Sequence, residues 1–165
     1  MTVADSLLLF KFVLAGGLAL WLTLGFFNNV MAFAAGVAAI GRLMNMQMFE
    51  QPPAIQHPCS PGALDKPILQ LVVYSFVTLI EGVAAALFWY AVFGLGGALS
   101  AGPDVGEAVA RANLALSALA FMCFIMLLGG GWFAYHIGQE GMQLTHFTLI
   151  GLSVAGAIVM NMPPV

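Results

Sequence analysis

The chain has 165 residues, of which 62% are hydrophobic, only 7% are charged and the formal net charge is −3. A soluble domain carries about 25% charged and about 45–50% apolar residues, and a nucleic-acid binder needs a basic surface to neutralise phosphates. Composition therefore excludes soluble enzymes, nucleic-acid binders and disordered proteins. It indicates an integral membrane protein.

Four apolar stretches are long enough to cross a membrane, because a hydrocarbon core about 30 Å thick needs roughly 20 helical residues. The first stretch contains Lys11, the second contains Glu81, and the third has no charged residue. We expect spans at residues 7–27, 68–93, 114–135 and 144–160. They predict one transmembrane domain over residues 1–165, an all-α four-helix bundle.

The connections between these spans differ in length. Residues 28–67 form a long connection with an apolar, Met-rich first half, which either extends the first helix or lies in the interface plane, and a second half with five prolines. Residues 94–112 predict a Gly-rich turn and an acidic helical lead-in, and residues 137–143 predict a short hairpin loop. We expect no disulfide between Cys59 and Cys123, since they fall in different environments.

Charge gives little information on orientation. With four spans, Lys11 and Arg111 lie on one side of the membrane, and Arg42 and Lys66 lie on the other. The positive-inside rule therefore gives no preference, because each side has two positively charged residues. Because the long first connection has few positive charges for its length, we prefer both termini in the cytoplasm.

Glu81 is the most informative residue, because a charged side chain near the centre of a span costs about 2.5–3.5 kcal/mol. Tyr74, Thr78 and Glu81 are spaced i, i+4 and i+7 and share one helical face. A polar helical face of this kind is typical of a proton or ion relay, of a site that hydrogen-bonds a cofactor, or of a structural contact with another helix. We favour the structural interpretation, with a neutral Glu81, because a single acid without a matching base makes a poor pathway.

Three further polar residues lie in or at the end of the first span. We expect Lys11 to extend its ammonium group to the near membrane face. Asn28 and Asn29 follow at the other end, where amides satisfy free helix carbonyls or fix the long connection against the bundle.

The third span ends in Gly-Gly-Gly-Trp-Phe-Ala-Tyr-His at residues 129–136. Gly130 and Gly131 suit a close contact with another helix, and Trp132 and Tyr135 suit the membrane interface.

His136 and, across the short loop, His146 lie near one membrane face in this prediction. Two such histidines are able to ligate a haem or a metal, although interfacial histidines bonded to loop carbonyls are the simpler interpretation. We predict no catalytic residue and no metal site.

Four short motifs follow one another along the chain. They are Phe27-Asn28-Asn29, the run Ala-Leu-Asp-Lys-Pro at 63–67, Tyr74 with Glu81, and Gly131-Trp132-Phe133. In these motifs the chain resembles the bacterial family DUF2165, described as predicted small integral membrane proteins. The resemblance implies a four-helix inner-membrane protein in which Tyr74 and Glu81 matter, and it implies no activity.

The leading functional hypothesis is a non-catalytic accessory subunit of a larger bacterial inner-membrane complex, respiratory or photosynthetic. Its partners are then membrane lipid and other integral membrane subunits. One alternative is a small proton-coupled transporter or channel built around Glu81. Another is a haem- or quinone-binding electron carrier that uses His136 and His146. We predict bound lipid and no cofactor under the leading hypothesis.

Overall fold

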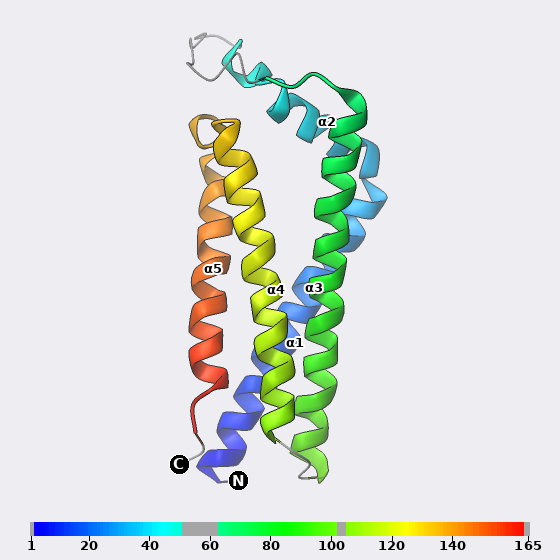
Figure 1. The fold of residues 1–165 in the computed structure, drawn as a ribbon. Helices are drawn as coiled ribbons and strands as arrows, with labels where there is room; N and C mark the ends of the chain where they lie inside the picture. The colour runs from blue at the N-terminus through cyan, green and yellow to red at the C-terminus, as the bar shows by residue number, and fades with distance from the viewer. Residues whose placement is uncertain (1, 51–62, 102–104, 164–165) are drawn as a thin grey trace.

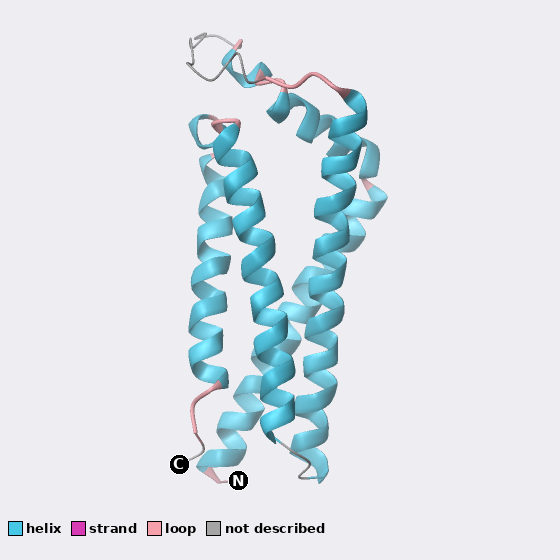
Figure 2. Ribbon diagram, in the orientation of Figure 1, coloured by secondary structure: helices cyan, strands magenta, loops and turns pink. Residues whose placement is uncertain are grey.

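The computed structural model describes residues 2–50, 63–101 and 105–163, and no strand occurs among them (Figures 1 and 2). In these three described ranges, four long helices and three shorter ones follow one another. They are α1 (Val3–Met31), α2 (Phe33–Met44), η1 (Gln47–Phe49), α3 (Pro67–Ala101), α4 (Val105–Trp132), η3 (Tyr135–Ile137) and α5 (Glu140–Met160). The long helices α1, α3, α4 and α5 are each long and apolar enough to cross a membrane, which confirms the predicted all-α bundle of four spans.

Local sequence signals set several helix ends. At the start of α1, Asp5 N–H donates to Thr2 Oγ1 (3.1 Å) and Thr2 N–H donates to Asp5 Oδ2 (2.8 Å), which makes a capping box. Pro67 begins α3, a position where its missing N–H costs nothing. Ahead of α3, Leu64 N–H donates to the carbonyl of Met44 (2.8 Å), so the described ends of the long connection meet.

The long helices pack in the order α1, α3, α4 and α5, each against the next. Both termini lie at one end of the bundle, which we call the terminal end (Figure 1). There the helices lie close together. Toward the opposite end α3 and α4 separate, and α2 lies beside α3, so we call this the α2 end.

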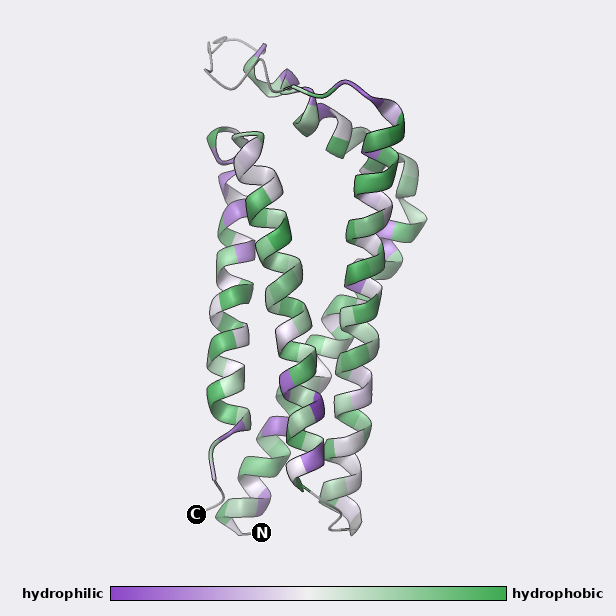
Figure 3. Cartoon of the chain, viewed as in Figure 1, coloured by the Kyte–Doolittle hydropathy of each residue, from purple (hydrophilic) through white to green (hydrophobic). Residues whose placement is uncertain are grey.

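Small side chains form much of the main core. Six alanines from three helices are completely buried, namely Ala15, Ala19, Ala84, Ala91, Ala112 and Ala115. Small residues let helices approach closely in lipid, where packing rather than hydrophobic burial drives association. The long helices consist mostly of hydrophobic residues (Figure 3), and many of their large hydrophobic side chains are exposed, as expected for contact with lipid.

The helices are longer than the hydropathy pattern predicts. The expected Gly-rich turn that starts at residue 94 is wrong, because α3 continues to Ala101, whereas the expected helical lead-in is confirmed, because α4 begins at Val105. Glycine is tolerated in transmembrane helices, and Gly94 lies where the two helices approach each other. A Cβ atom added there would lie 3.5 Å from the Cα atom of Ala108.

The other connections follow the predictions more closely. α4 and α5 pack side by side as an antiparallel hairpin, joined by η3 (Figure 1). The apolar half of the long connection first extends α1 to Met31 and then forms the separate helix α2. Cys59, His57 and four of the five prolines lie outside the described residues.

Candidate functional site

A hydrogen-bonded polar cluster lies between α1 and α3. The Tyr74 hydroxyl donates to the backbone carbonyl of Asn29 (3.0 Å), and the Asn29 side-chain amide donates to Glu81 Oε2 (2.6 Å). The Thr78 hydroxyl lies on the same helical face and is buried. The structure therefore connects Tyr74 to Glu81 through one residue of the neighbouring helix.

Two glycines make the room that this cluster needs. A Cβ atom at Gly25 would lie 2.5 Å from Glu81 Oε1, and one at Gly36 would overlap the Tyr74 ring. Phe33 packs edge-on against the same ring, with 5.1 Å between the ring centroids. The backbones of α1 and α2 thus fit around the polar side chains of α3. Sequence reasoning missed both glycines, whose only signal is their occurrence inside apolar helices.

The two asparagines at the end of α1 have different surroundings. Asn29 is half-buried and binds Glu81 through its amide. Asn28 is exposed. The pair therefore does not act as one unit, and of these two residues only Asn29 joins α1 to another helix through its side chain.

Lys11 takes no part in this cluster. Its ammonium group donates to the backbone carbonyls of Met160 (2.8 Å) and Met162 (3.1 Å), and the side chain is only 4% exposed. Lys11 therefore does not extend into open solvent, and its ammonium group is held by the chain itself at the terminal end of the bundle. The carbonyls at a helix C-terminus are free and carry partial negative charge, so the end of α5 offers the cation partners inside the bundle.

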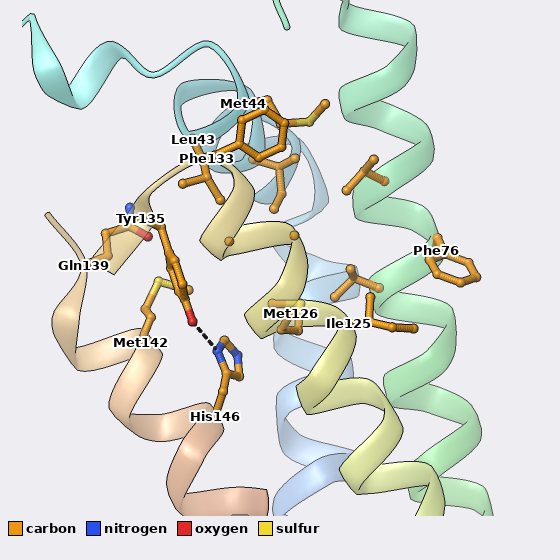
Figure 4. Close-up of a pocket in the computed structure, with 15 residues that line it drawn as sticks. Leu43, Met44, Phe76, Ile125, Met126, Phe133, Tyr135, Gln139, Met142 and His146 are labelled. Atoms are coloured by element: carbon orange, nitrogen blue, oxygen red, sulfur yellow. Dashed lines mark hydrogen bonds between the residues drawn. The ribbon is translucent and has the colours of Figure 1, made fainter. Parts of the chain in front are cut away.

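A second polar contact lies at the α2 end. The Tyr135 hydroxyl and His146 Nδ1 share a hydrogen bond of 3.4 Å (Figure 4). Tyr135 is 2% exposed and faces the interior of the bundle, whereas Trp132 is 68% exposed and is free to contact the membrane interface. Burial raises the pKa of the Tyr135 phenol, which therefore keeps its proton at neutral pH.

Backbone geometry after α4 brings Tyr135 into this position. Ala134 adopts a left-handed conformation with φ 51°, which turns the chain back beneath the end of α4. A Cβ atom at Gly130 would lie 2.6 Å from the Tyr135 ring, whereas nothing lies within 4 Å of one at Gly131. The predicted close helix contact at these glycines is therefore wrong, since Gly130 contacts a side chain and Gly131 faces open space.

The two histidines occupy different environments. His136 is exposed, whereas His146 is 8% exposed and faces Tyr135. Among the described residues no group of three or more His, Cys, Asp or Glu side chains is placed to hold a metal ion. The structure therefore does not present His136 and His146 as a ligand pair.

An apolar cavity of about 230 Å³ lies beside the Tyr135–His146 contact. Its walls come from α2, α3, α4, η3 and α5, and Figure 4 shows the labelled side chains that surround it. Tyr135, Gln139 and His146 supply polar groups on one side, and the remaining lining side chains are apolar.

Comparison with known sequences and structures adds the family. No curated protein and no solved structure matches the chain. The sequence pattern of DUF2165, described as predicted small integral membrane proteins, matches residues 7–163. This match confirms the resemblance seen in the four short motifs, and the chain belongs to the DUF2165 family of small integral membrane proteins.

Proposed function

We propose that the chain is a non-catalytic subunit of a larger membrane complex, and that a transmembrane helix of another subunit covers the α1–α3 surface around Glu81. The observation that carries this proposal is the half-buried Glu81 carboxyl group at membrane depth. In the same proposal the complex lies in a bacterial inner membrane, with both termini in the cytoplasm.

The depth of Glu81 follows from helix length. α3 has 35 residues and is therefore about 52 Å long, and Glu81 lies about 21 Å from its start. When a hydrocarbon core about 30 Å thick is centred on α3, the carboxyl group lies about 10 Å inside it. Water does not reach this depth on the lipid side, so the exposed part of the carboxyl group faces a solvent that makes no hydrogen bonds.

A partner helix would remove this cost. Asn29 satisfies Glu81 Oε2, and a further donor or acceptor on a neighbouring helix would complete the group. Polar side chains that bond across helices contribute about 0.6–2 kcal/mol in membranes. We therefore expect the partner to present a Ser, Thr, Asn, Gln or Tyr side chain at this depth.

The transporter alternative has weaker support. The hydrogen-bonded chain runs from Tyr74 through Asn29 to Glu81. Beyond Glu81 the buried face of α3 continues with the apolar Ala84, Ala85 and Phe88. The next polar contact with α1, from Trp89 Nε1 to Thr23 Oγ1 (3.0 Å), contains no ionisable group. A relay needs groups that continue across the membrane, so the cluster suits a fixed contact better than a pathway.

Site-specific photo-crosslinking in native membranes tests the proposal. A photoreactive residue at Asn28, which is exposed beside the cluster, is compared with one at Ile158 on α5, which is 64% exposed. We expect one discrete crosslinked protein from position 28 that Glu81→Leu abolishes and Glu81→Gln retains. Crosslinks from position 158 should not depend on Glu81.

Two results together would overturn the proposal. One is migration in mild detergent at the 17.4 kDa mass of the chain alone. The other is a crosslinking pattern at position 28 that is unchanged by Glu81→Leu.

A further inference from the structure

We propose that the cavity at the α2 end binds the ring-shaped head of a neutral, tailed molecule with the chemistry of an isoprenoid quinone, and that His146 Nε2 hydrogen-bonds an oxygen of that head. This inference is independent of the proposed subunit role. It rests on the size of the cavity, the placement of its polar groups and the free nitrogen of His146.

The volume fits one ring. An apolar cavity of about 150 Å³ holds a benzene molecule, and pockets for whole drug-sized ligands measure about 300–1,000 Å³. At about 230 Å³, this cavity has room for a substituted six-membered ring but not for a complete lipid. A larger ligand must therefore leave part of itself outside.

The polar groups lie on one side and carry no fixed charge. Tyr135, Gln139 and His146 are the lining residues with side chains able to hydrogen-bond, and the described lining includes no Asp, Glu, Lys or Arg. Such a wall recognises a neutral head that carries an oxygen. It offers nothing to pair with the charge of a phosphate or carboxylate head.

His146 has one ring nitrogen to spare. Its Nδ1 is engaged by the Tyr135 hydroxyl, and its Nε2 has no hydrogen-bond partner among the described residues. The bond at one ring nitrogen sets which nitrogen carries the proton. When the protonated phenol donates to Nδ1, Nε2 carries the hydrogen and can donate it to a carbonyl oxygen of the ligand.

The cavity also has a way out for a tail. Phe76 and Val77 on α3 and Ile125 and Met126 on α4 line this cavity, and α3 and α4 separate toward this end of the bundle (Figure 1). Phe76 is 48% exposed, so this border meets lipid. A ring held at His146 can extend an apolar chain between α3 and α4 into the bilayer.

Photolabelling of the full-length protein in phosphatidylcholine nanodiscs tests this inference. The probe is an azido-substituted quinone, the competitor is decylubiquinone, and mass spectrometry maps the labelled peptides. We expect label in the segments around Met126 and His146, and we expect decylubiquinone to displace it while oleic acid does not.

Matched variants sharpen the test. His146→Leu should raise the half-saturating quinone concentration about tenfold, which corresponds to about 1.4 kcal/mol. The control His136→Leu changes an exposed histidine outside the cavity and should leave binding unchanged. Tyr135→Phe should weaken binding about threefold, and Met126→Trp should abolish labelling by filling the cavity. Thermal unfolding identifies any variant that fails to fold. If the His146→Leu protein fails to fold, the Tyr135→Phe protein still tests the proposal.

Three outcomes would overturn the inference. One is label that maps elsewhere in the chain. Another is displacement by oleic acid as effective as by decylubiquinone, which would identify an acyl chain as the occupant. The third is equal quinone affinity of the His136→Leu protein, the Tyr135→Phe protein and the folded His146→Leu protein.

Discussion

The two ends of the bundle are built differently. Toward the terminal end, alanines and glycines such as Ala15, Ala112 and Gly94 line the contacts among α1, α3 and α4. The hollow of about 560 Å³ at this end lies beside Lys11 and the end of α5 and is partly polar. At the α2 end, Tyr135, His146 and several large apolar side chains surround a cavity of about 230 Å³, and α3 and α4 lie apart (Figure 1). The same two helices, α3 and α4, thus lie close where small residues form their contacts and apart where larger side chains surround a cavity.

Polar groups follow the same division. At the terminal end they close contacts, because Lys11 binds the last carbonyls of α5, and Asn113 and Asn161 exchange amide hydrogen bonds of 3.1 and 3.0 Å. In the half of the bundle nearer the α2 end, the Glu81 carboxyl group and the His146 ring keep hydrogen-bonding capacity that the described chain does not use up. The polar groups at the terminal end therefore hold the helices of this chain together. The polar groups toward the α2 end are the ones to which both proposals assign an outside molecule.

The largest expected effect comes from adding volume at the terminal end. Ala112→Leu should lower the free energy of unfolding by about 3 kcal/mol, because a completely buried alanine leaves no room for a larger side chain. The control Ala86→Leu changes an exposed alanine of α3 and should have little effect. Thermal unfolding in detergent measures both, and equal stabilities would mean that the close packing is not essential.

Loss of the Lys11 ammonium group should come next. Lys11→Met keeps the length of the side chain but leaves the carbonyls of Met160 and Met162 without their donor, at a cost of about 2 kcal/mol in unfolding free energy. Lys66→Met, at an exposed position, is the control. Denaturant titration compares the two variants, and an unchanged midpoint for Lys11→Met would contradict a stabilising role for this contact.

A smaller effect is expected at Glu81. Glu81→Leu removes the acceptor of the Asn29 amide and should cost about 1–2 kcal/mol in unfolding free energy. Glu81→Gln keeps an acceptor oxygen and should lose much less. Infrared spectra at neutral pH should also show a protonated carboxyl band that Glu81→Gln removes. A carboxylate band in its place would show an ionised Glu81 and favour the relay hypothesis.

The smallest effect concerns the support of Tyr135. Gly130→Ala and Gly131→Ala both gain helix propensity, but only Gly130→Ala pushes against the Tyr135 ring. We expect the Gly130→Ala protein to be about 1 kcal/mol less stable than the Gly131→Ala protein. Near-ultraviolet circular dichroism should show a changed tyrosine signal for Gly130→Ala alone.

Hydropathy was sufficient for the number of spans, because a stretch of roughly 20 apolar residues is a local property of the chain. The ends of the spans were harder to predict. The glycines at residues 94–97 look like a turn by composition, yet Gly94 lies in a continuous helix where it gives α4 room to approach. Local propensity gave way to helix packing at this point.

The polar contacts divide in the same way. The shared face of Tyr74, Thr78 and Glu81 follows from helical periodicity alone. The residue that joins Tyr74 to Glu81, Asn29, lies on another helix, and its part could not be predicted without the crossing of α1 and α3. The Tyr135–His146 contact depends on the left-handed turn at Ala134, which no residue preference at that position indicates.

The contact of Lys11 with the end of α5 has a consequence for biosynthesis. The carbonyl of Met160 lies 149 residues after Lys11, and ribosomes add about 5–20 residues per second, so roughly 7 to 30 s separate the two in translation. During that interval the ammonium group of the first helix lacks the carbonyls that it binds in the finished protein. The first helix therefore reaches its final packed position only after the last helix has been synthesised. The order of translation thus limits the order in which the bundle assembles.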